Sequence, residues 1–251
     1  MMDLISLAAL LAIVFFANFY AASVGGASIL ILPAMFFFGV SPAIAVGTNR
    51  LHRVFATGAM ASEFSKEIKF DRKDLTGFIL ISVIGSILGA FIVLNLNEEL
   101  LKNIILSAIF LIIILLLVKR DFGMTEKKVK VTKVSNPILY SGLFIIAVYR
   151  AIIGSAASTF LNLHLIVMKG YDYLKAAAAS SSIAFFSSLA AAILFVLFGL
   201  VDYILAIQMA VAGVLGGYLG AKFAIEKGNK FIQALFFAVA VLMILKIIFI
   251  G

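Results

Sequence analysis

Residues 23–53 read SVGGASILILPAMFFFGVSPAIAVGTNRLHR. The stretch is mostly apolar, yet it contains a glycine pair, two prolines, a Gly-Thr-Asn step and three basic side chains. Hydrocarbon supplies no hydrogen-bond partners, so an interrupted backbone at membrane depth must be buried in protein or line a watery cavity. Charges at that depth are costly and usually functional. We therefore expect this stretch to form half of a functional site inside a membrane.

The composition of the whole chain places it in a bilayer. Its 251 residues are 64% hydrophobic, the mean hydropathy is +1.20, and several apolar runs are about 20 residues long, the length that crosses a bilayer. There is no cysteine, which excludes disulfides, thiolate metal sites and cysteine nucleophiles. The net charge of +8 lies mostly in short loops, so it favours orientation signals over nucleic-acid binding. We expect an all-α, polytopic membrane protein.

Hydropathy divides the chain into two long interrupted segments and several single helices. The N-terminal run carries Asp3 and no Lys or Arg, so we interpret it as a retained membrane segment and not as a signal peptide. The expected elements are 3–38 (interrupted at 23–26), 42–63, 74–95, 99–118, a polar linker at 119–136, then 137–168 (interrupted at 154–158), 174–197, 203–223 and 230–250.

A repeat organises these elements. The motif at 85–90, GSILGA, recurs at 216–221 as GGYLGA, an offset of 131 residues (216 minus 85). The same offset pairs Asp71 with Asp202 and Gly39 with Gly170. We therefore predict two transmembrane repeats, residues 1–118 and 137–251, joined by the linker 119–136.

Loop charges orient the repeats. The loop at 63–74 and the linker 119–136 are rich in Lys and Arg and are predicted to be cytoplasmic, whereas the acidic loop at 95–99 is predicted to face outward. In the first half the basic loop follows the second predicted element, whereas in the second half the basic turn 224–230 follows the third. Equivalent turns therefore lie on opposite sides of the membrane, and the repeats are predicted to be inverted. We expect a multi-pass protein of the inner (cytoplasmic) cell membrane.

The predicted sides of the loops require each interrupted segment to begin and end on the same side of the membrane, so each is expected to be a hairpin. Residues 137–168 must begin and end on the cytoplasmic side, and 3–38 must begin and end outside, so each is expected to be a broken, re-entrant pair of helices. Both chain termini are predicted to lie outside. Inverted repeats with broken helices that meet at the midplane are a recurrent plan of transporters.

The stretch GGASILILPAMFFFGVSPAIAVGTN resembles the signature of the TauE/SafE family of sulfite exporters, in which a Gly-rich stretch precedes a Pro, a Gly and an Ala-x-Gly-Thr-Ser-like step. The basic loop, GSILGA and the two-half layout also fit. The resemblance implies a multi-pass permease for a small sulfur-containing anion, such as sulfite, sulfonate, sulfoacetate or thiosulfate. The implied driving force is a proton gradient or the anion's own gradient. Asn49 and Arg50 depart from the signature, and the second Gly-rich stretch is reduced to GSAAS, with Asn162 or His164 at its Pro position.

Arg50 and Arg53 are the strongest candidates for anion binding. A rise of about 1.5 Å per residue from Pro42 puts them near the middle of the bilayer core, and a spacing of three residues puts them on one face. Guanidinium groups suit oxyanions such as sulfite and sulfonate. The alternatives are a structural ion pair, with Glu63 as the nearest carboxylate, and snorkelling toward the membrane surface.

Further candidates come from both repeats. Arg150 could approach the same site from the second hairpin, or snorkel to the cytoplasmic surface. Gly25 and Gly26 would expose backbone N–H groups to an anion, with Ser155 as a matching donor, although small residues also serve helix packing. The predicted neutral partners are Thr48, Asn49 and Ser180, followed by Ser181 and Ser182; serines in membrane helices also bond their own backbone.

His52 and His164 are the titratable candidates for proton coupling, although a lone histidine is more often structural. They lack the partners of a metal site, and no cofactor is expected. The predicted partners are a small anionic substrate, the lipid bilayer and a coupled proton. We therefore predict a secondary transporter, an exporter that works by alternating access around a midplane anion site. The alternatives are an anion channel, a carrier of another small carboxylate or inorganic anion, and, remotely, an intramembrane serine hydrolase built on Ser28.

Overall fold

The computed structural model describes residues 3–105, 107, 135–152, 154 and 157–250. Within these ranges the protein is helical and has no strand, which confirms the all-α prediction. The helices are α1 (Leu4–Val24), α2 (Ser28–Phe37), α3 (Pro42–Glu67), α4 (Arg72–Leu94), α6 (Ser135–Ile152), α7 (Ala157–Lys169), α8 (Tyr173–Leu197) and α9 (Tyr203–Ile250). The predicted linker 119–136 lies outside the described residues except for 135 and 136, which begin α6, and so does most of the predicted helix 99–118.

Helix length and apolarity make this a multi-pass membrane protein. Four described helices can cross a bilayer by length and composition, namely Leu4–Val24, Arg72–Leu94, Tyr173–Leu197 and Tyr203–Gly228. Helix α3 has 26 residues and is long enough, but its polar residues lower its hydropathy. Those residues are buried against other helices, so α3 is the polar centre of an apolar bundle.

Both predicted helix interruptions are present. The break between α1 and α2 contains Gly25 (φ 83°) and Gly26 (φ 84°), a left-handed backbone that suits glycine. The break between α6 and α7 contains Gly154 (φ 72°). Each long segment therefore folds as a hairpin of two helices.

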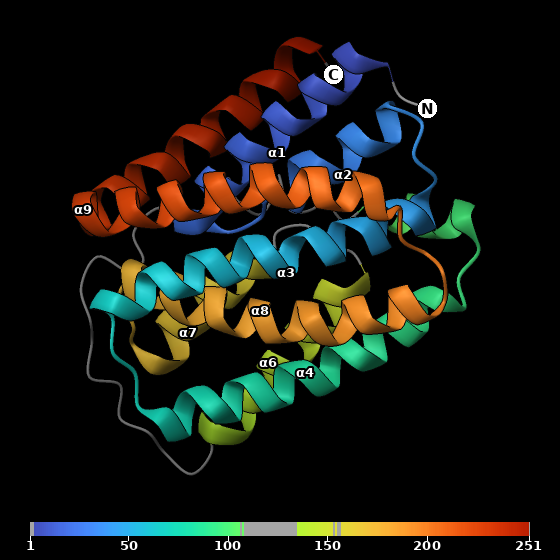
Figure 1. Ribbon diagram of the computed structural model, residues 1–251. Helices are drawn as coiled ribbons and strands as arrows, with labels where there is room; N and C mark the ends of the chain where they lie inside the picture. The colour runs from blue at the N-terminus through green and yellow to red at the C-terminus, as the bar shows by residue number, and fades with distance from the viewer. Residues whose placement is uncertain (1–2, 106, 108–134, 153, 155–156, 251) are drawn as a thin grey trace.

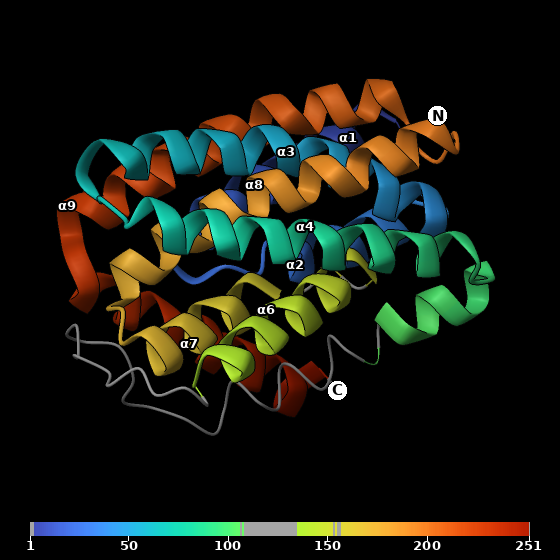
Figure 2. The ribbon, with the colours of Figure 1, turned by 90° about the horizontal axis from the view of Figure 1, so that it is seen from below.

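The two hairpins enter the bundle from opposite ends. Helix α6 runs parallel to α4, because Gly77, Gly85 and Gly89 of α4 meet successive residues along α6. Helix α1 runs parallel to the first part of α9, since Gly216 lies against Phe15 and Gly220 against Phe19. Figures 1 and 2 show α1–α2 opening toward one end and α6–α7 toward the other. This arrangement fits the predicted inverted repeats, which stay a prediction as a duplication.

The last helix is longer than predicted before it turns. The sequence suggested separate helices at 203–223 and 230–250, whereas the first part of α9 continues to Gly228, where a positive φ of 69° breaks it. Glycine permits this sharp reversal because it has no Cβ. The second part of α9 then reverses direction after Gly228 (Figure 1).

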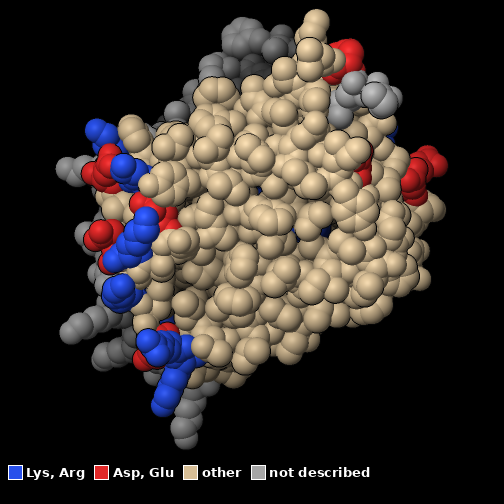
Figure 3. Space-filling model, in the orientation of Figure 1, with Lys and Arg blue, Asp and Glu red and all other residues tan. Residues whose placement is uncertain are grey.

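The surface matches a bilayer environment. Large apolar side chains are exposed on the helices, for example Ile5 (83%), Phe37 (84%) and Ile204 (74%). On the face shown in Figure 3, Lys and Arg gather at one end of the molecule, and the opposite end carries mainly acidic residues. An apolar belt between two charged ends is the expected surface of a membrane-spanning protein.

Candidate functional site

The middle of α3 carries a buried polar face. Asn49, Arg50, His52, Arg53 and Thr57 are all at most 7% exposed. A helix places residues three and four apart on one side, and this side of α3 faces the two helix breaks. The site is therefore built on a continuous helix and completed by the interrupted hairpins.

Arg53 donates a hydrogen bond from Nη1 to Asn18 Oδ1 on α1, over 2.8 Å. Asn18 is itself held by a 2.8 Å bond from Nδ2 to the Val14 carbonyl. A guanidinium has five N–H donors, so one neutral acceptor leaves most of them unused. The positive charge of Arg53 thus keeps hydrogen-bonding capacity for another partner.

Arg50 is engaged by the end of α6. Its Nη2 donates to the carbonyl of Arg150 and, over 3.2 Å, to the carbonyl of Ala151. The last carbonyls of a helix have no partner within the helix and carry its negative dipole end, so a cation is favourable there. Arg50 therefore fastens the tip of the second hairpin to α3.

Arg150 supplies a third buried cation. It is 5% exposed, and its Nη2 has no hydrogen-bond partner. It lies close enough to Arg50 and Arg53 for the three charges to repel one another. A site that collects cations in this way favours an anion.

Carboxylates do not neutralise these arginines in the part of the chain that the structure describes. The ion pairs found there are Lys66–Glu63 and Lys169–Asp74. Glu63, the carboxylate considered as a structural partner from the sequence, is thus paired with Lys66. Arg50 and Arg53, at 3% and 7% exposure, also point inward and do not snorkel.

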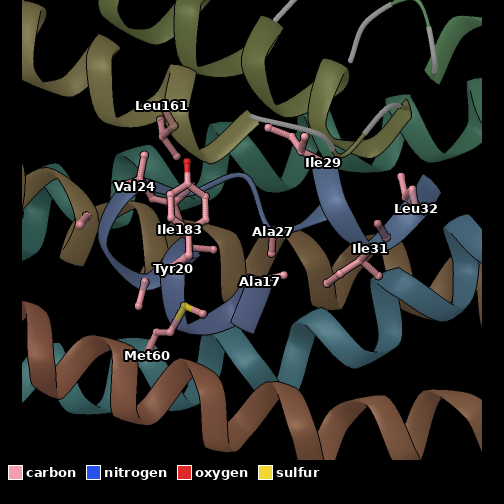
Figure 4. Packing of buried hydrophobic residues seen from close by; sticks show 14 of the residues in the cluster. Ala17, Tyr20, Val24, Ala27, Ile29, Ile31, Leu32, Met60, Leu161 and Ile183 are labelled. Carbon is pink, nitrogen blue, oxygen red and sulfur yellow. The ribbon is translucent and has the colours of Figure 1, made fainter. Parts of the chain in front are cut away.

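A small cavity of about 10 Å³ lies beside Arg53, with room for about one water. Apolar side chains that include Tyr20, Met60, Leu161 and Ile183 pack in this region (Figure 4). The cavity is lined by Ala21, Gly25, Arg53, Thr57, Met60, Ser158, Asn162, Ala177, Ser180, Ser181 and Ala184. It thus joins both hairpins to α3 and α8, and an anion of several atoms can enter only if these helices separate.

Two polar groups in the cavity wall lack partners. Ser180 Oγ and Asn162 Oδ1 are buried without a hydrogen bond, in side chains that are 3% and 5% exposed. A buried polar atom without a partner costs about 1–3 kcal/mol. Such atoms beside a cationic group mark a place where a polar ligand or a water belongs.

The tips of the two hairpins are fastened to each other. The Val24 carbonyl at the end of α1 accepts from Thr159 Oγ1 over 3.0 Å and from Asn162 Nδ2 over 3.4 Å. A Cβ on Gly25 would stand 2.7 Å from the Thr159 backbone nitrogen, so this contact requires glycine. Gly25 therefore serves the close packing of the two breaks as well as the cavity.

Thr48, Asn49 and Gly26 do not line the cavity. Thr48 Oγ1 accepts from the Asp202 backbone N–H over 3.0 Å, and Asn49 Nδ2 donates to Ser28 Oγ over 2.9 Å. These bonds tie α3 to the start of α9 and to α2. Gly26 shapes the first break, and Ser155 lies outside the described residues.

The two histidines have different surroundings. His52 is fully buried, and its Nε2 lies 3.4 Å from Asn18 Nδ2, within the network that holds Arg53. His164 Nε2 lies 2.9 Å from the Leu139 carbonyl and packs on Gly142, inside the second hairpin. Within the described ranges, no three of His, Asp and Glu gather as metal ligands.

Sequence reasoning missed Asn18, Thr57 and Ser158, and it noted Asn162 only as a departure from the family pattern. Each is a neutral polar residue in an apolar helix, a feature that by itself indicates little. The contact between Arg53 and Asn18 joins residues 35 apart in the chain. A search for amides facing a buried arginine would have found them once the helices were paired.

The fold is that of a helical, multi-pass membrane protein with a buried cationic centre. The chain matches the family described as "Sulfite exporter TauE/SafE" over residues 10–247, and it belongs to that family. This finding confirms the resemblance seen in residues 25–49.

Known relatives cover nearly the whole chain. A probable membrane transporter protein of Haemophilus influenzae is 27% identical over 97% of this chain and 94% of its own length. The probable membrane transporter protein ORF9 of a Sinorhizobium species is 26% identical, over 96% and 92% respectively. The probable membrane transporter protein YfcA of Escherichia coli K12 is also 26% identical. No solved structure matches the chain.

Proposed function

We propose that this protein is a secondary transporter, working as an exporter, of a small sulfur-containing anion of the sulfite, sulfonate, sulfoacetate or thiosulfate class. One observation carries the proposal. Arg53 is buried at mid-helix beside a polar cavity, and it has no carboxylate partner among the described residues. A translocon scale assigns about 2.5–3.5 kcal/mol to an arginine at that depth, a cost that a bound anion offsets.

The chemistry of the cavity suits an oxyanion. Arg53 offers a planar set of N–H donors, which matches the oxygens of a sulfonate or sulfite better than a point charge would. The Ser180 hydroxyl adds a free donor. Arg150 adds long-range attraction without a contact to the cavity wall.

The closed cavity supports alternating access over a continuous pore. It has a volume of about 10 Å³ and lies where the two hairpins meet. The first hairpin is fastened to α7 through the Val24 carbonyl, and the second to α3 through Arg50. Since the hairpins enter from opposite ends, release of one set of contacts at a time would expose the cavity to one side at a time. A proton that moves with the anion is part of the proposal, and His52, in contact with Asn18, is its candidate carrier.

The enzyme alternative gains no support from the geometry. Ser28 Oγ accepts a hydrogen bond from Asn49. The ring nitrogens of His52 and His164 lie at hydrogen-bond distance from Asn18 and from the Leu139 carbonyl, respectively. The nucleophile pattern of a serine hydrolase requires a base within hydrogen-bond reach of the serine. The family and its relatives are transporters.

The test is sulfite flux in proteoliposomes with purified protein. Arg53→Gln should reduce flux about tenfold or more, because a charge-assisted hydrogen bond to the anion is lost. Arg72→Gln, at the exposed start of α4, is the matched control and should leave flux unchanged. Equal flux through wild type and Arg53→Gln would overturn the site assignment, and a panel of sulfite, sulfate, thiosulfate, taurine and sulfoacetate would rank the substrates.

A further inference from the structure

Asn162 departs from the family pattern, and the mechanism proposed above does not use it as a ligand. Asn162 lies on α7, is 5% exposed and lines the cavity beside Arg53. Its amide nitrogen donates to the Val24 carbonyl over 3.4 Å. The amide is therefore oriented, because a carbonyl can accept only from the nitrogen end.

This orientation leaves Asn162 Oδ1 as a buried acceptor without a donor. Arg53 Nη1 is already bonded to Asn18 Oδ1, and Ser181 Oγ donates to the Ala177 carbonyl over 2.9 Å. The wall of the cavity thus presents donors from Arg53 and Ser180 and hydroxyl groups that can both donate and accept. Asn162 Oδ1 differs from these groups because it can only accept and has no donor. A fully deprotonated oxyanion can satisfy only the donors.

We infer that the transported anion carries a hydrogen-bond donor of its own, an O–H or N–H group that binds Asn162 Oδ1 while its oxygens bind Arg53. The inference rests on the proposed function and adds to it the protonation state of the substrate. For sulfite, the species with these features is hydrogensulfite, a monoanion with one O–H group. One proton then crosses the membrane with each anion, bound to the anion itself. In this refinement the anion takes the place of His52 as the carrier of the coupled proton.

The expected selectivity follows from the cost of leaving a buried acceptor without a donor. A site that is built to bond a donor rejects an analogue that lacks it, because the analogue leaves a buried acceptor without a partner. Methanesulfinate is a suitable analogue, since a methyl group replaces the hydroxyl of hydrogensulfite on the same sulfur atom. The two anions have the same charge and nearly the same shape.

The experiment measures how each anion competes with labelled sulfite for exchange in proteoliposomes, at one mildly acidic pH at which sulfite is present as hydrogensulfite. In wild type, hydrogensulfite should bind roughly 5- to 150-fold more tightly than methanesulfinate. In Asn162→Leu, which removes the acceptor at similar volume, the ratio should approach unity. Thr159→Val is the matched control, because Thr159 also donates to the Val24 carbonyl but does not line the cavity; its ratio should stay as in wild type.

The outcomes are distinct. Equal binding of both anions by wild type would overturn the inference and leave the proposed function standing, with a water as the donor to Asn162. Discrimination that survives in Asn162→Leu, or that is lost equally in Thr159→Val, would also overturn it. Binding of neither anion by wild type would overturn the proposed function itself. The comparison in wild type needs no variant, so a folding defect cannot obscure it.

Discussion

Arg50 and Arg53 lie three residues apart on α3, yet their guanidinium groups meet different surroundings. Arg50 donates to the carbonyls of Arg150 and Ala151 at the end of α6, whereas Arg53 bonds one amide oxygen and faces the cavity. A cation at a helix C-terminus stabilises the fold. A buried cation without a counter-charge destabilises it. The two arginines should therefore have opposite effects on stability.

Arg50→Gln should destabilise the protein by about 1.5–3 kcal/mol, because a charged donor to buried carbonyls is removed. Arg53→Gln should leave stability unchanged or raise it, since it removes an uncompensated buried charge. The measurement is the midpoint of thermal denaturation of each purified variant in detergent, without added anion. A larger loss in Arg53→Gln than in Arg50→Gln would contradict this division of roles.

The arginines could be predicted from the sequence and their partners could not. A charge in the middle of an apolar helix is conspicuous because of its free-energy cost, so Arg50, Arg53 and Arg150 stood out. Asn18 and Asn162 are neutral, and their importance depends on which helices pack together. The sequence alone also assigns Arg50 and Arg53 the same role in anion binding. Their roles differ only because the end of α6 packs against Arg50 and accepts its hydrogen bonds.

Helix packing in this protein depends on glycine faces. Gly216 and Gly220 of α9 lie against the backbone of α1, and Gly85 and Gly89 of α4 lie against α6. Small residues allow the close approach that holds membrane helices together. Helix α9 of the second predicted repeat thus packs against α1 of the first, and α4 of the first repeat packs against α6 of the second. Because α1 and α6 are the first helices of the two hairpins, these glycine contacts set the position of the hairpin tips.

Gly216→Ala should weaken the protein strongly, because the new Cβ would stand 2.2 Å from the Phe15 carbonyl oxygen, and backbone cannot easily move away. We expect a loss of about 1–3 kcal/mol or more. Gly58→Ala is the control: its Cβ would meet the Phe185 ring at 3.1 Å, and a side chain can shift. Thermal midpoints of the two variants in detergent test this, and an equal loss in both would argue against a tight α1–α9 contact.

Helix positions followed closely from hydropathy, whereas two helix ends did not. The sequence placed the end of the helix after Pro42 at residue 63, but α3 continues to Glu67, where Lys66 and Glu63 pair on its last turn. The first part of α9 likewise extends to Gly228. Amphipathic ends that leave the bilayer carry charged residues, so an apolarity criterion stops too early. Glycines, in contrast, located both helix breaks.

At the scale of the whole molecule, the distribution of charge predicts its orientation. Lys66 and Lys169 lie at the ends of α3 and α7, and Arg72 begins α4. Asp3 and Asp202 precede α1 and the first part of α9, which run parallel to each other. On the face shown in Figure 3, Lys and Arg gather at one end of the molecule and the opposite end carries mainly acidic residues. In Figure 1, which has the orientation of Figure 3, both marked chain ends lie away from the end where Lys and Arg gather. The positive-inside rule therefore predicts that the lysine-rich end is cytoplasmic and that both termini lie outside.

The absence of cysteine from the sequence makes this orientation directly testable. Single variants Lys69→Cys and Glu98→Cys place one thiol at each end of the bundle, in exposed positions. A membrane-impermeant maleimide applied to intact cells should label Glu98→Cys, whereas Lys69→Cys should react only after the membrane is permeabilised. The unmodified protein, which has no thiol, is the control for background. Labelling of Lys69→Cys in intact cells, with protection of Glu98→Cys, would invert the orientation. It would then also reverse the side to which each hairpin opens, because the hairpins enter from opposite ends.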